Sequence, residues 1–161
     1  MKNIKQQIID RGLESNARII LPEVNDNRIR EATKELISIG YNVIDINDYD
    51  NNYDNYLEML STMKFCKSWP YKEIKKYLDD PINYGLITVA NGDADGLVAG
   101  ASTSSSEVIR SAIRIVGINE MSKWVSSIFF LISPCGNHAY TFADCAVMPE
   151  PDSQQLATIA S

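Results

Sequence analysis

The residues from Gly92 to Arg110 (GDADGLVAGASTSSSEVIR) have the types and spacing of a site for an anion. Gly100 and Ala101 are small enough for a ligand to approach the backbone, and a hydroxyl-rich turn, 102–106, follows them. Backbone amides at the start of the next helix would bind a phosphate, and Arg110, about one turn into that helix, would add a bidentate donor. A plain capped helix with a solvated Arg110 has the same pattern, so both interpretations stay open.

Asp144 is a second candidate, because it follows the predicted strand 140–143 at its C-terminal end. In open α/β sheets, ligands bind outside such ends. Asp93 and Asp95 are two residues apart at the entrance of a strand, where alternation sends their side chains to opposite sides. That spacing favours turn and backbone-capping roles over acid–base chemistry. His138, the only histidine, lies in a turn without a cluster of metal ligands and is expected at the surface.

The composition excludes several classes of function. The formal net charge is -6 and the pI about 4.7, which disfavours nonspecific nucleic-acid binding because that needs clustered Lys and Arg. The acidic run 45–54 lacks the Gly and the final Glu of a calcium-binding EF-hand loop, so no metal is predicted. The longest apolar run, 128–132, is too short to span a bilayer, so no membrane partner is expected.

The three cysteines, Cys66, Cys135 and Cys145, are widely spaced and form no CxxC pair. They predict neither a disulfide framework nor a zinc site, and they fit reduced thiols in a cytoplasmic protein. Each is interpreted as a small core residue. A chain of 161 residues is long enough for one domain with its own core.

The first half of the chain predicts the elements that would position these residues. The apolar run 18–21 (RIIL) is typical of a buried parallel strand. Asn25 and Asp26 are candidate N-caps for a helix that ends near Gly40, and 42–46 (NVIDI) is the next strand. Strand, helix and strand with short connections predict a βαβ unit, and therefore an α/β fold with a parallel sheet.

Periodicity and turn residues predict the other elements. Helices are expected over 3–14, 56–65, 71–78, 83–90, 105–116 and 153–159, and strands over 95–101, 125–132 and 139–142, the last two joined by a turn. The final helix, capped by Asp152 or Ser153, is too short to be stable alone and lacks a stop signal, so further chain is expected after it.

Three stretches of this sequence resemble the phosphate acetyltransferase family. Residues 93–113 hold DADGLVAGA and then SSSEVIRSAI, and residues 125–160 hold VSSIFFLIS and then TFADCAVMPEPDSQQLATIA. Upstream, residues 17–33 (ARIILPEVNDNRIREAT) are similar to the family's opening, a strand that ends in LPE and a helix with an arginine near its start. The stretches cover nearly the whole chain in the family's order.

The resemblance implies transfer of an acetyl group between coenzyme A and inorganic phosphate, with coenzyme A as a substrate and no cofactor. It implies two three-layer α/β domains like those of isocitrate and isopropylmalate dehydrogenases, a homodimer, and an active site between the domains. Arg110 would hold the phosphate or acetyl phosphate, and Ser104 and Ser105 would lie in the same anion-binding turn. Lys64 stands where the family has a second active-site arginine, and keeps the charge without the bidentate fork.

The sequence also departs from the family. Ser111 replaces the proline that usually follows the arginine, and the stretch 40–56 is too short for the usual two strands with a helix between them. The family's catalytic Ser-Arg pair and the aspartate that deprotonates coenzyme A would lie beyond Ser161. Residues 1–161 are therefore expected to be an N-terminal portion without a catalytic residue, inactive alone. A non-catalytic remnant or partner-dependent subunit that binds phosphate, and a phosphate butyryltransferase, remain alternatives.

Overall fold

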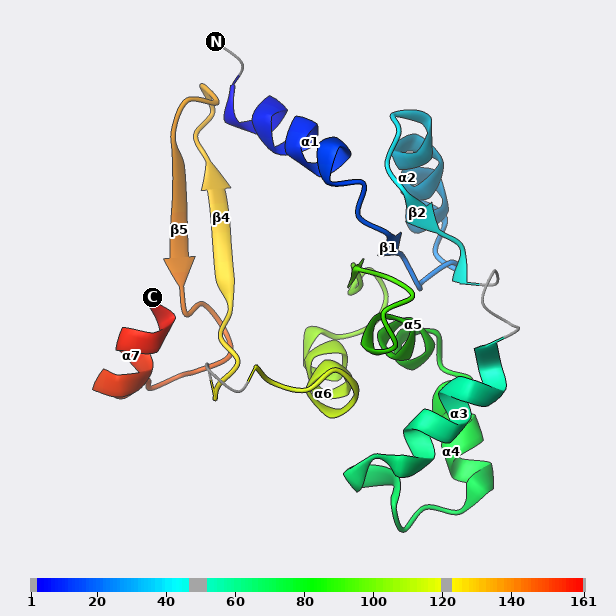
Figure 1. Ribbon diagram of the computed structural model, residues 1–161. Helices are drawn as coiled ribbons and strands as arrows, with labels where there is room; N and C mark the ends of the chain where they lie inside the picture. Colours follow the sequence, from blue (N-terminus) through cyan, green and yellow to red (C-terminus); the bar gives the residue numbers. More distant parts are fainter. Residues whose placement is uncertain (1–2, 47–51, 120–122, 161) are drawn as a thin grey trace. The chain divides into compact units, whose positions relative to one another are not determined.

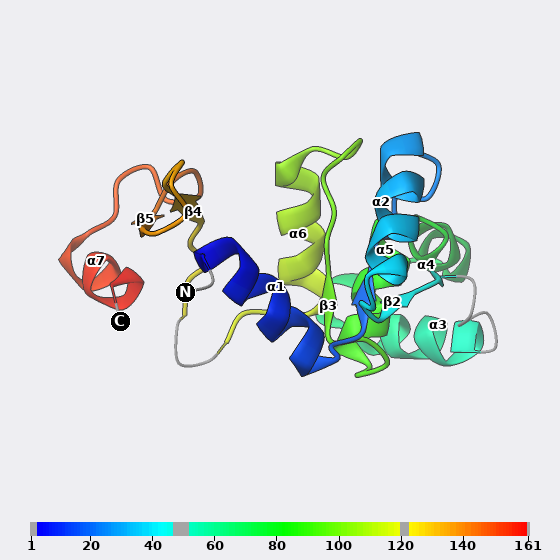
Figure 2. The same ribbon diagram turned by 90° about the horizontal axis from the view of Figure 1, so that it is seen from above.

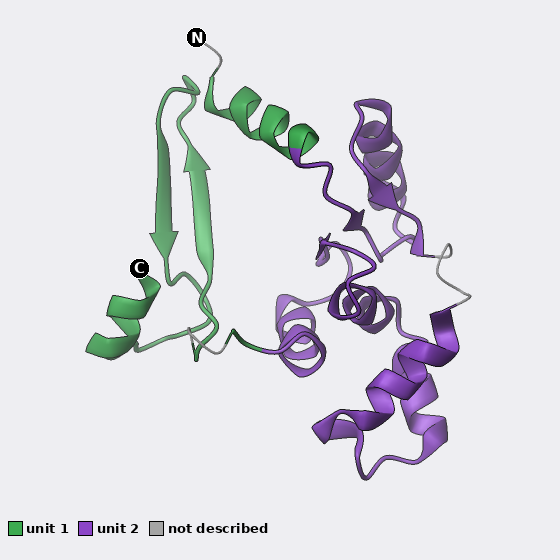
Figure 3. Cartoon of the chain, in the orientation of Figure 1, with its two compact units in different colours: residues 1–14, 118–161 green, residues 15–117 purple. Residues whose placement is uncertain are grey.

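The computed structural model describes residues 3–46, 52–119 and 123–160 (Figure 1). The chain divides into two compact units, which Figure 3 distinguishes by colour. Unit 2 consists of residues 15–117, and unit 1 combines residues 1–14 with 118–161. Part of the predicted acidic loop, 47–51, lies outside the described residues.

Unit 2 is built on a three-stranded parallel sheet with the strand order β2-β1-β3. The strands are β1 (Ile19–Ile20), β2 (Val43–Ile44) and β3 (Gly96–Leu97). Both neighbours pair with β1 in parallel, and α2 (Asn27–Ser38) connects β1 to β2. Asp26 caps α2 by accepting a hydrogen bond from the Arg28 N–H, and Gly40 follows the helix with a φ of 101°. The predicted parallel sheet and the Asp26 cap are confirmed.

The helices after β2 supply most of the hydrophobic core. They are α3 (Tyr53–Thr62), the 3-10 helix η2 (Lys64–Cys66), α4 (Tyr71–Leu78) and α5 (Pro81–Ala90). The helix predicted over 71–78 is confirmed to the residue. The helix predicted from residue 83 begins at Pro81, because the Asp80 carboxylate accepts hydrogen bonds from the next free amides, those of Ile82 and Asn83.

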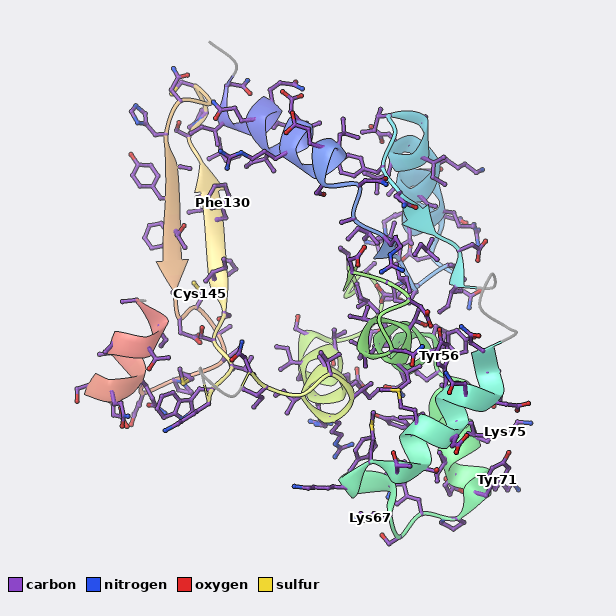
Figure 4. All side chains as sticks on the ribbon, viewed as in Figure 1. Tyr56, Lys67, Tyr71, Lys75, Phe130 and Cys145 are labelled. Carbon is purple, nitrogen blue, oxygen red and sulfur yellow. The ribbon has the colours of Figure 1, made fainter. Side chains whose placement is uncertain are left out.

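Core packing ties α3 and α5 to the sheet. Tyr56, labelled in Figure 4, is fully buried on α3, and its ring meets that of Tyr84 on α5 edge-on, with centroids 5.4 Å apart. Gly85 lets α5 approach the strands closely: a Cβ atom there would lie 2.6 Å from Leu97 Cδ1 and 3.3 Å from Ile20 Cγ2. Helix α6 (Ser105–Ile115) packs beside α5, and Figure 2 shows both from a second side.

Unit 1 contains α1 (Ile4–Ser15, of which residue 15 falls in unit 2), β4 (Ile128–Ile132), β5 (Ala139–Ala143) and α7 (Ser153–Ile159). Strands β4 and β5 form an antiparallel hairpin with Phe130 opposite Thr141, as the predicted strand pair required. The Ile4 N–H donates to the Gly136 carbonyl in the hairpin turn at 2.9 Å. Asp152 caps α7 in a capping box with Gln155, and the predicted bounds of this helix are confirmed.

The hairpin carries large apolar side chains that remain exposed on both faces. Ile128 is 61% exposed and Phe129 59%, and the neighbouring strand contributes Tyr140 and Phe142 at 57% and 55%. Phe130, labelled in Figure 4, is also exposed. Every buried core residue among those described belongs to unit 2. The hairpin therefore presents a cluster of exposed apolar side chains, a feature typical of interaction surfaces.

Candidate functional site

The candidate anion site lies where β3 leads into α6, at the carboxyl edge of the parallel sheet. Ser104 caps α6 in a capping box: its Oγ accepts from the Glu107 N–H at 3.4 Å, and Glu107 Oε2 accepts from the Ser104 N–H at 3.2 Å. The Ser-x-x-Glu spacing of residues 104–107 explains why the helix begins there. The Ser104 hydroxyl also donates to Glu107 Oε2 at 2.6 Å, so its proton is already committed within the chain.

The amides of the turn before Ser104 are occupied by the carboxylate of Glu23. Glu23 Oε2 accepts from the N–H groups of Gly100 and Ala101, at 2.8 and 2.7 Å. Its Oε1 accepts from the N–H groups of Ser102 and Thr103, at 2.8 and 2.7 Å, and from the Ser102 hydroxyl at 2.9 Å. The chain's own carboxylate therefore occupies the amides of the turn 100–103. Phosphate binding by amides at the start of the next helix stays a prediction.

The surroundings keep Glu23 ionised. Burial raises the pKa of its carboxyl group, but the backbone N–H donors of Ala101, Ser102 and Thr103 and the Ser102 hydroxyl outweigh that effect and bring the pKa to about 2. The side chain is 7% exposed. A buried charge is tolerated when donors saturate it, and here both oxygens are saturated.

Arg28 holds the same turn through its carbonyl side. Its Nη2 donates to the Ala101 carbonyl at 2.7 Å and to Asp26 Oδ2 at 2.6 Å. Asp26 is also the cap of α2. The segment from Glu23 to Arg28 therefore binds N–H groups of the turn through Glu23 and one of its carbonyl groups through Arg28. The connection after β1 and the connection after β3 are thus joined at one edge of the sheet.

The two predicted cationic residues both belong to unit 2 and are exposed. Arg110 lies on α6, and its guanidinium makes no hydrogen bond or ion pair with any residue that the structure describes. After the hydrogen bonds from Ser104, the charge of Arg110 is a further cause that lowers the pKa of Glu107. Lys64 begins η2, next to Phe65, whose ring centroid lies 5.9 Å from Arg114 Cζ near the end of α6.

Ser105 occupies the first position of α6 and is exposed. Its hydroxyl has no hydrogen-bond partner within residues 3–46, 52–119 and 123–160, in contrast to that of Ser104. Of the two predicted serines, Ser105 is therefore the one whose hydroxyl proton remains available to a ligand.

Asp93 and Asp95 have structural roles, as the sequence predicted. Asp95 Oδ2 accepts from the Arg18 N–H at 2.7 Å, and its carboxylate pairs with the Arg18 guanidinium at 2.8 Å. Asp93 accepts from the Tyr56 hydroxyl at 2.6 Å and from Asn91 at 2.8 Å. These bonds lower the pKa of both carboxyl groups, which suits fixed acceptors rather than proton carriers.

Asp144 lies in unit 1 and closes the end of the hairpin. Its carboxylate accepts from the N–H and hydroxyl of Ser127 at 3.0 and 2.8 Å, and from the N–H groups of Ala146 and Val147 at 2.8 and 2.9 Å. Burial raises its pKa, but these donors prevail and hold the pKa well below the usual range. Strand β5 pairs antiparallel with β4, so the rule for open parallel sheets does not apply to this residue. Its role in binding stays a prediction.

The other residues considered as ligands or nucleophiles are His138 and the three cysteines. Within the described ranges, no group of three potential metal ligands gathers, and His138 is exposed as expected. All three cysteines are free, but only Cys66 is buried. The core interpretation is wrong for Cys135, which the hairpin turn exposes, and Cys145 is half-buried. In the part of the chain that the structure describes, no helix has the length and apolar character needed to cross a membrane.

A hollow of about 170 Å³ adjoins the start of α6. The carboxyl groups of Asp80 and Glu107 line it, so its electrostatics oppose an anion. The other lining residues are Ile82, Asn83, Thr103 and Ser111. Arg110 and Ser105 therefore remain the groups on α6 best suited to hold phosphate.

Fold and site together define an α/β protein whose ordered turn, at the carboxyl edge of a parallel sheet, presents a cationic helix. Comparison with known proteins gives the family. The family model for phosphate acetyl/butaryl transferase matches residues 38–161, and the chain belongs to this family.

Curated relatives agree with that family. The phosphate acetyltransferase of Acetivibrio thermocellus is 30% identical over 182 residues, covering 96% of this chain and 55% of the relative. That of Bacillus subtilis is 34% identical over 138 residues, covering 84% of this chain and 42% of the relative. The chain spans about half the length of the curated relatives it matches. The first alignment is longer than this chain, so that relative carries residues within the matched region that this chain lacks.

Solved structures show the same fold. A phosphotransacetylase from Staphylococcus aureus matches with a TM-score of 0.81 and 27% identity, and one from Streptococcus pyogenes with 0.78 and 25%. Each match covers 99% of this chain and 56% of the other.

Sequence reasoning missed Glu23 as a member of the site. One signal was present: a glutamate directly after a strand and Pro22 lies where the chain has just left the core. Because charged residues are seldom fully buried without partners, a buried glutamate there requires a set of donors. The turn 100–103 was the available set.

Proposed function

We propose that this chain forms the phosphate-binding part of a phosphate acetyltransferase, which transfers an acetyl group between coenzyme A and inorganic phosphate. The observation that carries the proposal is the exposed Arg110 guanidinium, unpaired among the described residues, on the helix that the ordered turn 100–103 positions. Family membership and the names of the curated relatives support the reaction. From the family resemblance, we expect coenzyme A to be a substrate and no separate cofactor to take part.

The residues present suit the task of holding phosphate. A guanidinium donates two parallel hydrogen bonds to a phosphate, and Arg110 has no competing carboxylate bonded to it among the described residues. The Ser105 hydroxyl at the start of α6 adds a donor, while Ser104 supports the helix through Glu107. Lys64 would add a point charge. Fixing the phosphate lowers the entropic cost of its attack on the thioester carbonyl.

The proposal extends to the whole protein in three respects. We infer a dehydrogenase-like two-domain fold, a homodimer and a cytoplasmic location for the complete enzyme, all from the family resemblance. The donors that stabilise the tetrahedral oxyanion, and the group that deprotonates coenzyme A, would come from the half of the family's length that this chain does not match.

The test is phosphate binding to the 161-residue chain, measured by isothermal titration calorimetry. Arg110→Ala should weaken binding at least about tenfold, since a charge-assisted bidentate contact is lost. Arg110→Lys should recover part of the affinity, and Lys34→Ala, which removes an exposed lysine on α2, should leave it unchanged. Equal phosphate affinity of the wild-type and Arg110→Ala chains would refute the proposal.

A second candidate is a phosphate-binding subunit that works only with a partner, and the exposed apolar hairpin β4–β5 favours it. Acetyl phosphate formation from acetyl-CoA and phosphate should then be absent for the chain alone. Addition of the purified C-terminal half of the Acetivibrio thermocellus relative should restore it. Robust turnover without any addition would contradict both the partner requirement and the expectation of an inactive half.

A further inference from the structure

Glu23 is a buried anion whose five hydrogen bonds all go to one turn. Four of the donors are consecutive backbone N–H groups, from Gly100 to Thr103, and the fifth is the Ser102 hydroxyl. Because both carboxylate oxygens are saturated and the side chain is 7% exposed, Glu23 is neither a general base nor a ligand for substrate. Any contribution of Glu23 to function must therefore come from the conformation of the turn 100–103 that its hydrogen bonds stabilise.

The backbone of that turn has the form of an anion-binding nest. Successive backbone N–H groups in a turn can point at one anion, and Gly100 adopts a positive φ of 107° at the beginning of this turn. Such concavities bind phosphates and other anions in many proteins. Here the anion is a side chain located 77 to 80 residues earlier in the sequence.

The nest is joined directly to the predicted phosphate-binding helix. Thr103, the last donor to Glu23, precedes Ser104, the N-cap of α6, and Arg110 lies further along the same helix. The bond from Arg28 to the Ala101 carbonyl fixes the turn from its other side. Without an anion in the nest, four amides would lose their acceptor, and the entry into α6 would lose the contacts that define it.

We propose that Glu23 is a positioning residue: its carboxylate replaces an external anion in the nest 100–103 and thereby sets the start of α6 and the direction of Arg110. The proposal rests on the proposed function, since Arg110 is the group being positioned. It also implies that the nest belongs to the scaffold, and that the substrate phosphate is held by α6 side chains beyond it.

The proposal is tested with Glu23→Ala, with Glu31→Ala as a control, because Glu31 is exposed on α2 and has no bond to the turn. The readouts are the ¹H–¹⁵N shifts of the amides 100–103 and the dissociation constant for inorganic phosphate. We expect Glu23→Ala to weaken phosphate binding roughly 10- to 100-fold, because a misdirected Arg110 loses part of its charge-assisted bidentate contact. Sodium formate, a carboxylate small enough for the vacated space, should return the amide shifts toward wild type and restore affinity, whereas sodium chloride should not.

Unchanged phosphate affinity in Glu23→Ala overturns the positioning role. Weakened affinity that formate does not restore overturns it as well, because it would show only a general loss of structure. If Glu23→Ala does not fold, Glu23→Gln replaces it. The amide keeps the shape but sets an NH2 group against two N–H donors, so the affinity should fall, and wild-type affinity would reject the proposal.

The proposed function fails separately from this inference. A wild-type chain that does not bind phosphate, or that binds it equally after Arg110→Ala, rejects the phosphate site on α6. The formate response of the amides 100–103 in Glu23→Ala still decides whether the carboxylate occupies the nest. Absence of that response, in a folded variant, rejects the nest itself.

Discussion

Replacing Glu23 by glutamine should make the stability of the chain less dependent on pH. Burial raises the pKa of Glu23, but the N–H donors of residues 101–103 and the Ser102 hydroxyl outweigh it and lower the pKa from 4.5 to about 2 in the folded protein. A group whose pKa is lowered by folding stabilises the protein above its unfolded pKa and loses that contribution as the pH falls through its folded pKa. The sensitive window therefore runs from about pH 4.5 down to about pH 2.

The magnitude follows from the two pKa values. A difference of roughly 2.5 units corresponds to about 3 kcal/mol of stability at pH 7, to order of magnitude. At pH 3 roughly 1 kcal/mol of this remains, so about 2 kcal/mol should disappear between pH 7 and pH 3. Solvent screens the Glu23 carboxylate little because the side chain is almost fully buried, so its pKa shift contributes to stability nearly in full.

The measurement is urea unfolding of the wild-type chain and Glu23→Gln, followed by tryptophan fluorescence at several pH values from 7 to 3. The contributions of Asp95 and Asp144, whose pKa values are also lowered, are common to both proteins and cancel in the difference. Glu31→Gln, a change at an exposed residue of α2, serves as the control and should follow the wild type throughout. A difference between wild type and Glu23→Gln that is small at pH 7, or that stays constant down to pH 3, would refute the linkage argument.

Three further predictions concern packing, the hairpin and the thiols. Leu60→Ala should lower the free energy of unfolding by about 2–5 kcal/mol, because Leu60 is fully buried, while Ile37→Ala, at a 54% exposed position, should change it by less than about 1 kcal/mol. Light scattering should show self-association of the chain, and Phe130→Lys should reduce it by breaking the apolar surface of the hairpin; a monodisperse wild-type monomer contradicts this. Iodoacetamide should alkylate Cys135 well before Cys66, because hydrogen bonding, foremost from the Ser133 hydroxyl, lowers the pKa of the exposed thiol and burial raises that of the other; mass spectrometry at timed intervals gives the order.

Elements with strong local signals could be predicted closely from the sequence. The helix over 71–78 and the helix over 153–159 have the predicted bounds, since Pro70 and the Asp152 capping box mark where each begins. The hairpin β4–β5 was also predictable, because two apolar segments are separated by a turn rich in Pro, Gly and Asn. These features depend on residues within a few positions of one another.

Strand lengths were less predictable. The segments 18–21, 42–46 and 95–101 were expected as strands, whereas each strand of the parallel sheet has two residues. An apolar run indicates buried, extended backbone, but a strand also requires a paired neighbour along its length. The sheet can extend only where β1 faces both partners, and the register of Ile19 and Ile20 with Val43–Ile44 and Gly96–Leu97 sets that limit.

Glu23 shows why the sequence alone did not reveal the carboxylate that occupies the turn 100–103. The turn 100–103 (GAST) offers several backbone N–H donors, and a glutamate near the end of a buried strand offers an acceptor. Neither feature identifies its hydrogen-bond partner. The partner is determined by strand order: β1 and β3 are neighbours in a parallel sheet, so the connections that follow them emerge at the same edge. A carboxylate in one such connection has a far higher effective concentration at the N–H groups of the other than an external anion has. It therefore forms hydrogen bonds with those N–H groups in preference to the external anion. A turn rich in small and hydroxyl residues therefore predicts a phosphate site only after the partners of the charged residues in the adjacent connection have been identified.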